Sequence, residues 1–220
     1  FFILLSPFAF KTLNLKKGDE VITPTFTIIS CLNQIVRMGA KPILVDADQL
    51  TFNINPSDVK AKITKKTKAI LIVHIYGLPV DIDPIIKIAK KKKIYIVEDA
   101  SEQIGQTYKD KPIGSFGDIS TFSFFANKHI STGEGGMIAT NNKKFAEKFS
   151  ILKNISFQPK KQKFIHEELG WNYRMTNMQA AIGLAQLEKI NQFIKKKRIM
   201  GNFYNNEFKK HERGSFRESN

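Results

Sequence analysis

Short hydrophobic runs alternate along the chain with stretches in which hydrophobic residues recur every three or four positions. The first pattern predicts strands and the second predicts amphipathic helices. The predicted strands are 20–23, 41–48, 68–77, 94–100, 117–125 and 135–141. The predicted helices are 26–39, 55–63, 81–93, 143–154 and 175–208.

Punctuating residues support several of these boundaries. Asn55 precedes Pro56, as at the start of a helix. The lysines of 90–93 lie at the C-terminal end of the predicted helix 81–93, where the helix dipole favours cations. Gly183 and Gly201 are expected to break the last helical stretch. The segment 41–48, "KPILVDAD", is typical of a buried strand.

Regular alternation of strands and helices predicts an α/β fold, a three-layer sandwich around a mostly parallel sheet with helices on both faces. Binding sites in such sheets lie beyond the carboxyl ends of the strands. The side chains that follow each predicted strand are therefore the candidates for chemistry.

Composition narrows the function classes. Hydrophobic residues make up 42% of the 220 residues, enough for a sizeable core. The net charge is +15, but only five of the 35 basic residues are arginine, so a nucleic-acid groove is not indicated. The positive charge is suited to attracting an anionic small molecule. The single cysteine, Cys31, excludes an internal disulfide and a cysteine-based metal site, and a cytoplasmic setting is expected.

The two ends of the chain carry no clear signal. The opening "FFILLSPFAF" has neither the basic flank of a signal peptide nor the length of a membrane span. It also lacks a methionine, which suggests a start inside a longer gene product. The polar ending "HERGSFRESN" is expected to fray.

Two acidic residues, Glu98 and Asp99, follow Val97 at the expected carboxyl end of a strand. One interpretation is a pair of acids facing a solvent-exposed loop. The other is that one carboxylate points into a cleft and meets a cation, because a buried charge is costly unless it is paired.

A lysine, Lys128, follows the next predicted strand, five residues after Ser123. Gly133, Gly135 and Gly136 keep the turn after it free of side chains. This turn matches neither the phosphate-binding loop nor the dinucleotide fingerprint. Pyridoxal phosphate would explain the combination, because it needs a lysine amine and an acid beside its pyridine nitrogen. An opposite charge about 4 Å away is worth about 4 kcal/mol at an effective dielectric constant of about 20.

At this level of detail the chain resembles the DegT/DnrJ/EryC1/StrS family of sugar aminotransferases. Matching segments run in order from about residue 11 to 208 and include "GDEVITPTFT", "GAKPILVDAD", "NKHISTGEGG" and "LGWNYRMTNMQAAIGLAQLEKI". The acid in "EDASE" and the glycine loop are most similar to those of GDP-perosamine synthases. The resemblance implies the large domain of a fold type I pyridoxal phosphate enzyme. It also implies transamination of a nucleotide-linked 4-keto-6-deoxy sugar with glutamate, in polysaccharide or O-antigen synthesis.

The resemblance also implies roles for individual residues. Lys128 matches the lysine that forms the Schiff base and moves the proton, and Asp99 matches the acid at the pyridine nitrogen. Glu102 matches the position beside the ring hydroxyl, where many members carry glutamine. Ser123 matches a phosphate ligand. Asn172 matches a residue that reaches the cofactor phosphate of a neighbouring subunit, so a homodimer with shared sites is expected.

Other positions depart from the family or stay open. Ile28 stands where many members place an aromatic ring over the cofactor. Members carry a phosphate-binding glycine-threonine pair before the segment that matches "LNLKKGDE", whereas this chain has "FFILLSPFAF" there, without such a pair. Members also continue into a smaller domain. We therefore expect residues 1–190 to be the cofactor-binding domain and 191–220 a helical connection. His74 and His129 receive no role. Trp171 and Tyr173 are expected to pack at an interface.

Two alternatives remain. The first is a pyridoxal phosphate-dependent sugar dehydratase of the same fold, in which histidine replaces the lysine; here Lys128 is present and His129 lies one position later. The second is a remnant that binds cofactor or a partner without catalysis.

Overall fold

The computed structural model describes residues 5–159, 162 and 164–210. The predicted fraying end, 211–220, lies outside the described residues, as do the first four residues. In chain order the elements are α1 (Leu5–Thr12), β1 (Glu20–Pro24), α2 (Ile29–Arg37), β2 (Lys41–Val45), α3 (Pro56–Lys62), β3 (Thr67–Val73), η2 (Ile75–Gly77), α4 (Asp83–Lys92), β4 (Tyr95–Asp99), β5 (Thr107–Tyr108), β6 (Lys111–Pro112), β7 (Ile119–Ser123), β8 (Gly136–Ala139), α5 (Lys143–Leu152), α6 (Asn177–Leu187) and α7 (Ile190–Lys209).

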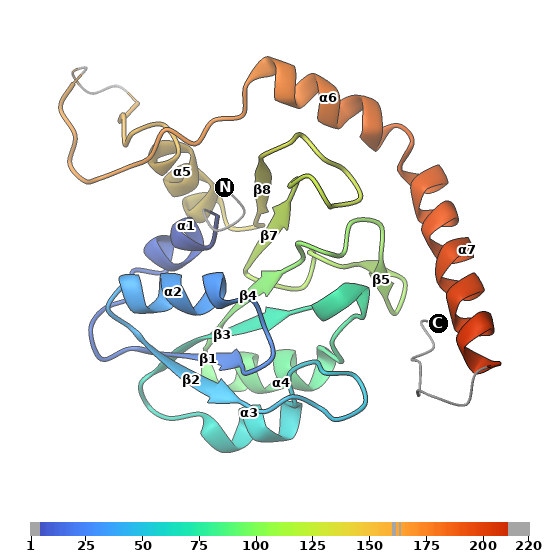
Figure 1. Cartoon of the computed structure of the whole chain (residues 1–220). Helices are drawn as coiled ribbons and strands as arrows, with labels where there is room; N and C mark the ends of the chain where they lie inside the picture. Colours follow the sequence, from blue (N-terminus) through green and yellow to red (C-terminus); the bar gives the residue numbers. More distant parts are fainter. Residues whose placement is uncertain (1–4, 160–161, 163, 211–220) are drawn as a thin grey trace.

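A six-stranded sheet in the order β2-β1-β3-β4-β7-β8 forms the centre of the molecule (Figure 1). The first five strands of that order pair in parallel, and β8 pairs with β7 antiparallel. The short strands β5 and β6 form a separate antiparallel pair. The predicted α/β architecture with a mostly parallel sheet is confirmed.

Helices cover both faces of the sheet, and alternate residues of each strand feed two separate cores. Leu71 and Val97 point to the face covered by α1, α2 and α5, where Phe8 is buried. Ile70 and Ile96 point to the opposite face, against α3 and α4. Each fully buried aliphatic side chain stabilises the fold by roughly 1.5–3 kcal/mol, so the parallel strands are held from both sides.

The start of α3 has the predicted local signal. The Asn55 side chain accepts hydrogen bonds from the backbone N–H groups of Ser57 and Asp58, with Pro56 in the first turn of α3. At the end of α4, the chain leaves the helix through Lys93 in the left-handed conformation.

Two expectations about elements are wrong. The strand β2 is not a buried strand: it lies at the edge of the sheet, and Leu44 is 44% exposed. The final helical stretch does not break at its glycines, because Gly183 lies inside α6 and Gly201 inside α7. A glycine inside a helix costs only about 1 kcal/mol relative to alanine. The interruption falls instead at residues 188–189.

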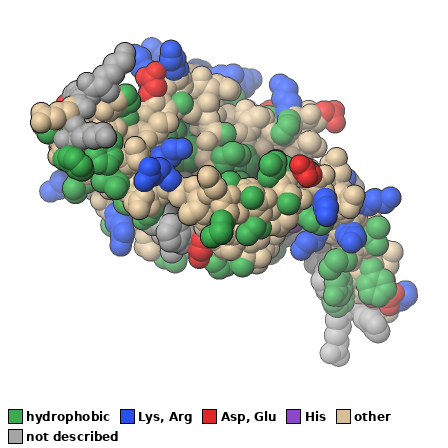
Figure 2. Space-filling view, turned by 90° about the horizontal axis from the view of Figure 1, so that it is seen from above, with side chains coloured by type: hydrophobic (Ala, Val, Ile, Leu, Met, Phe, Trp, Pro, Cys, Tyr) green, Lys and Arg blue, Asp and Glu red, His purple; other side chains and the backbone are tan. Residues whose placement is uncertain are grey.

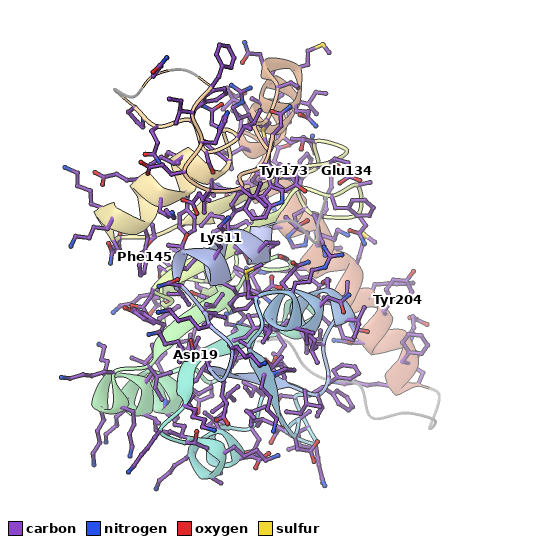
Figure 3. The ribbon with its side chains drawn as sticks, turned by 90° about the vertical axis from the view of Figure 1, so that its left-hand side faces the viewer. Lys11, Asp19, Glu134, Phe145, Tyr173 and Tyr204 are labelled. Atoms are coloured by element: carbon purple, nitrogen blue, oxygen red, sulfur yellow. The ribbon has the colours of Figure 1, made fainter. Side chains whose placement is uncertain are left out.

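The segment around residues 168–173 is fastened to α1 and α5. Glu168 forms ion pairs with Lys11 and Lys148, and Lys11 also lies 4.9 Å from the centre of the Trp171 ring. Figure 3 shows Lys11 and Phe145 on this side of the molecule. The rings of Trp171 and Tyr173, expected at an interface, pack edge-on against Phe8 within the chain, at 5.0 and 5.6 Å between ring centres.

The last two helices curve around one side of the sheet, and α7 reaches furthest from its centre (Figure 1). Exposed hydrophobic side chains on α7 include Ile199, Met200, Phe203 and Tyr204. Hydrophobic side chains are also visible on the projecting part of the molecule beside the grey residues in Figure 2. No helix within the described ranges is both long and apolar enough to cross a membrane.

Candidate active site

A cavity of about 400 Å³ opens at the carboxyl ends of β3, β4 and β7. Its size falls within the range of roughly 300–1,000 Å³ that is typical of small-molecule sites. It is lined by Ile28, Val73, His74, Ile75, Asp99, Ser101, Glu102, Phe125, Asn127 and Lys128. Residues from three strand ends and their following loops therefore meet at one place, as expected for a parallel sheet.

Asp99 provides a carboxylate in this cavity and is only 7% exposed. One oxygen, Oδ1, accepts a hydrogen bond from the backbone N–H of Ser101 at 3.0 Å. The other, Oδ2, lies 3.5 Å from Sγ of Cys31 on α2. Burial and the adjacent Asp99 carboxylate raise the pKa of the Cys31 thiol well above its usual range, so this thiol donates to Asp99.

Lys128 forms the second charged group of the cavity. Its Nζ lies 3.0 Å from Oε1 of Glu102, and the lysine side chain is 9% exposed. The second oxygen, Oε2 of Glu102, accepts the backbone N–H of Tyr76 at 2.8 Å. Tyr76 adopts φ 50°, in the left-handed region that a tyrosine rarely occupies. The Glu102 carboxylate is thus fixed from both sides, and it holds the lysine side chain toward the cavity.

Glu98 is fully buried, and its carboxylate collects five hydrogen bonds. The donors are the backbone N–H groups of Gly114, Phe116 and Gly117, the Ser120 hydroxyl and the His74 ring. Burial by itself would raise the pKa of Glu98, but hydrogen bonds from His74 and from the backbone of Gly114 and Gly117 more than offset it and hold the pKa below its usual value.

The ring of His74 is oriented by two partners. Its Nδ1 accepts the backbone N–H of Val80 at 3.0 Å, so Nδ1 carries no proton. The other nitrogen, Nε2, lies 3.1 Å from Glu98 and is the donor. His74 also lines the cavity, with its ring held between the Val80 N–H and Glu98.

The acidic pair forms the last two residues of its strand, within the predicted range 94–100. Glu98 and Asp99 both belong to β4, and both are buried. Successive side chains of a strand point to opposite faces. Glu98 accordingly faces His74, and Asp99 faces Cys31. The interpretation of a solvent-facing acidic pair is wrong. Asp99 lines the cavity, as the cleft interpretation expected, but its hydrogen-bond partners within the described residues are the Ser101 N–H and the Cys31 thiol rather than a cation.

The structure brings together four of the six residues that the sequence singled out. Asp99, Glu102, Lys128 and Ile28 line the cavity. Ser123, at the end of β7, is buried and accepts the backbone N–H of Phe125 at 3.2 Å, and it is not among the lining residues.

Asn172 is the sixth of these residues. It is exposed and pairs with Asn154 in an isolated β-bridge, and it is not among the residues that line the cavity. Sequence reasoning missed Ser101, Phe125 and Asn127, although each lies within four residues of a strand end.

The turn after Lys128 needs its glycines. Gly133 and Gly135 have φ values of 74° and 151°. A Cβ atom at Gly135 would lie 2.5 Å from the Thr132 hydroxyl oxygen. A Cβ atom at Gly133 would meet nothing within 4 Å, and Gly136 already belongs to β8, so the expected close approach is found at Gly135.

These residues fit pyridoxal phosphate. A buried carboxylate and a lysine share one cavity with hydrophobic walls from Ile28, Val73 and Ile75, which suits a flat, charged aromatic ring. Within the described part of the chain, no group of three or more histidine, cysteine or acidic residues is arranged to hold a metal ion.

Comparison with known proteins gives a consistent picture. The sequence profile of the DegT/DnrJ/EryC1/StrS aminotransferase family matches residues 7–218. The chain is 48% identical over 196 residues to a GDP-perosamine synthase of Escherichia coli O157:H7, covering 89% of this chain and 54% of the relative. It is 43% identical over 199 residues to a GDP-perosamine synthase of Vibrio cholerae, covering 90% and 54%.

Solved structures agree with the fold. An aminotransferase from Psychrobacter cryohalolentis is 36% identical with a TM-score of 0.79, over 86% of this chain and 50% of that protein. DesV of S. venezuelae is 33% identical with a TM-score of 0.81, over 87% and 51%. The chain thus spans about half the length of the relatives that it matches.

Proposed function

Because this chain belongs to the DegT/DnrJ/EryC1/StrS aminotransferase family, we propose that it forms the cofactor-binding part of a pyridoxal phosphate-dependent nucleotide-sugar aminotransferase. The substrate would be a nucleotide-linked 4-keto-6-deoxy sugar, with glutamate as amino donor, as the similarity to GDP-perosamine synthases suggests. The product would enter polysaccharide or O-antigen synthesis in the cytoplasm. The observation that carries the proposal is the meeting of Lys128, Asp99 and Glu102 in one cavity.

Lys128 is proposed to hold the cofactor and to take up and return the proton of the carbon that bears the amino group. Its position supports both roles, because the ammonium group is little exposed and its partner Glu102 can take part in proton exchange. When bound, pyridoxal phosphate supplies an electron sink for a carbanion next to the nitrogen.

Asp99 is proposed to pair with the pyridine nitrogen. The Ser101 N–H and the Cys31 thiol both donate to its carboxylate, which fixes the carboxylate in the cavity wall. Glu102 is proposed to face the ring hydroxyl, since it already lies beside Lys128.

Ser123 and Asn172 are proposed to bind the cofactor phosphate. Ser123 lies at the end of the strand that precedes Lys128. Asn172 is exposed, which leaves it available to a second subunit, and a homodimer with shared sites is therefore part of the proposal. Residues 1–190 would form the cofactor-binding domain and 191–220 the connection to a smaller one.

The decisive experiment is borohydride reduction of the protein with pyridoxal phosphate, followed by peptide mass spectrometry. We expect the label on Lys128 and no label in a Lys128→Ala variant. A label on another lysine would overturn the assignment, and a protein that stays colourless and unlabelled would favour a non-catalytic remnant. A screen of nucleotide-linked 4-keto sugars with glutamate then tests the substrate class.

A further inference from the structure

A second cavity, of about 250 Å³, adjoins the first. The two share Ser101, Glu102, Asn127 and Lys128, so the Lys128–Glu102 ion pair stands between them. The second cavity does not include Asp99 among its lining residues. A molecule that reacts beside Lys128 can therefore extend into the second cavity without displacing a ring held at Asp99.

Residues distant in sequence build the far wall of this cavity. His129 comes from the lysine loop, and Lys197 comes from α7. Nδ1 of His129 lies 3.1 Å from the carbonyl oxygen of Ile104. Because a carbonyl only accepts, Nδ1 is the donor there, and Nε2 of the neutral ring is an acceptor.

The position of Lys197 is set by contacts of α7 on both sides of it. Ile194 packs against Gly105 so closely that a Cβ atom on the glycine would lie 2.0 Å from Cδ1 of Ile194. On the other side, Nη2 of Arg198 lies 3.3 Å from Oε1 of Gln106. The helix is thus anchored across the loop 104–106, and Lys197 is held at the cavity.

Lys197 is the cation that this cavity keeps when Lys128 holds the cofactor, and Glu102 is the acidic residue among those that line it. One oxygen of Glu102 accepts the Tyr76 N–H, which offsets part of its charge. A ligand with concentrated negative charge would be stabilised here.

An aromatic surface continues from the same cavity. Tyr76 lines it and is 77% exposed. The Tyr76 ring lies 5.9 Å from the ring of Phe26, which in turn lies 5.3 Å from Phe52. All three rings are at least 39% exposed. Exposed rings of this kind stack on nucleobases, as in other nucleotide-binding proteins.

We propose that the second cavity binds the diphosphate of the nucleotide-linked substrate, with Lys197 as its main ligand and Tyr76 beside the nucleoside. This inference rests on the proposed function, because it places the sugar next to Lys128 in the first cavity. The order of groups in the substrate, sugar then diphosphate then base, matches the order of reactive lysine, basic cavity and aromatic surface.

Calorimetric titration of the cofactor-loaded protein with GDP tests the proposal. Lys197→Ala should weaken GDP binding about tenfold, since a hydrogen bond to a charged group is lost. Lys197→Arg should retain most of the affinity. The control is Lys196→Ala, which removes an equal charge from α7 at a residue outside the cavity lining, and it should leave affinity within about twofold.

Two further arms identify what each part of the site binds. With inorganic pyrophosphate as ligand, Lys197→Ala should again weaken binding, whereas Tyr76→Ala should weaken GDP binding only. In steady-state kinetics Lys197→Ala should raise KM for the nucleotide sugar and leave the half-reaction with glutamate unchanged.

Several results would overturn the inference. They are no GDP binding by the native protein, equal GDP affinity of Lys197→Ala and the native protein, or a loss in the glutamate half-reaction as large as that for the sugar. The last result would assign the cavity to the donor carboxylate. These outcomes differ from failure of the proposed function, which would appear as absence of cofactor on Lys128.

Discussion

At the scale of single residues, Glu98 and Asp99 show how two adjacent carboxylates acquire different tasks. Both are in the part of β4 that pairs with β7, at the end of the strand, and both are buried. The Glu98 carboxylate accepts hydrogen bonds from five donors in three segments of the fold, and it holds those segments together. Asp99 keeps its place in the cavity wall, with only two donors. The first is therefore structural, and the second is available for a ligand.

Replacing Glu98 by glutamine should destabilise the protein by about 2–3 kcal/mol, because charge-assisted hydrogen bonds are lost and the new amide donors face the backbone N–H groups. Urea unfolding at neutral pH measures this loss. The conservative Ser120→Ala variant removes only one of the five donors and should cost about 1 kcal/mol. Equal stability of Glu98→Gln and the native protein would contradict the role.

The same residue predicts a dependence of stability on pH. The pKa of Glu98 is held below its ordinary value of 4.5 in the folded protein. Its contribution is therefore complete above pH 4.5 and is lost as the pH falls through the lower, folded pKa. Between about pH 6 and pH 3, where a glutamate titrates, the unfolding free energy should fall less steeply with decreasing pH in Glu98→Gln than in the native protein. Parallel curves would show that other carboxylates dominate.

Asp99→Asn should act on chemistry and leave the fold intact. An asparagine can still accept the Ser101 N–H, but it carries no charge to set against a pyridinium. Losing about 4 kcal/mol would slow proton abstraction by roughly a thousandfold. Single-turnover transamination measures the rate, with urea unfolding as the control. Near-native turnover in this variant would rule out the proposed role.

At the scale of elements, the glycines of the C-terminal half have opposite meanings. Gly135 has φ 151° and Thr132 within reach of any added Cβ, whereas Gly201 lies inside α7 with nothing within 4 Å. One glycine is required by a close turn, and the other is only a weak point in a helix.

Alanine at these two positions should therefore change stability in opposite directions. Gly135→Ala should destabilise the protein by about 1–3 kcal/mol through backbone strain and the clash with Thr132. Gly201→Ala should stabilise it by about 0.5–1 kcal/mol, because alanine loses less backbone entropy in a helix. Thermal unfolding followed by circular dichroism measures both changes. A stabilising Gly135→Ala would show that the turn can relax.

Elements and residues differed in how far the sequence could predict them. Strand and helix order followed from periodicity, because buried runs such as 68–73 satisfy two cores at once. The edge position of β2 could not be read this way, since Leu44 is as hydrophobic as a buried residue and only the sheet order exposes it.

The site residues also differ in how far the sequence could predict them. Lys128 and Asp99 were predictable, because strand ends of a parallel sheet converge. Tyr76 and Lys197 were not, since a left-handed backbone and the docking of α7 on Gly105 depend on contacts between distant segments.

At the scale of the whole molecule, α6 and α7 leave hydrophobic side chains exposed on the arm that curves around the sheet. Met178 is 78% exposed and Phe203 is 60% exposed. Tyr204 is labelled on this arm in Figure 3. Such a surface is suited to partners, and a second copy of the protein is the partner that the proposed shared site requires.

Mixing two impaired variants tests the shared site. If Asn172 serves the neighbouring subunit, an Asn172→Ala chain combined with a Lys128→Ala chain should regain part of the activity, because one site of each mixed dimer is intact. Asn172→Ala alone should weaken cofactor affinity by about 1–3 kcal/mol. Mixing Lys128→Ala with itself is the control. Full-length protein that is monomeric and active, or a mixture without rescue, would defeat the model.

The antiparallel pair of β7 and β8 has a consequence for how the protein folds. Ser123 pairs with Gly136, so the pairing closes a loop of twelve residues, 124–135, whereas the parallel pair of β1 and β3 joins Glu20 to Thr67. Short loops close with the smaller entropic penalty, and contacts near in sequence form earlier. The loop that carries Lys128 is therefore expected to assemble before Asp99 and the ion-pair partner Glu102 arrive from the neighbouring strand end. The reactive lysine would belong to an early part of the folding pathway, and its acidic environment would be completed late.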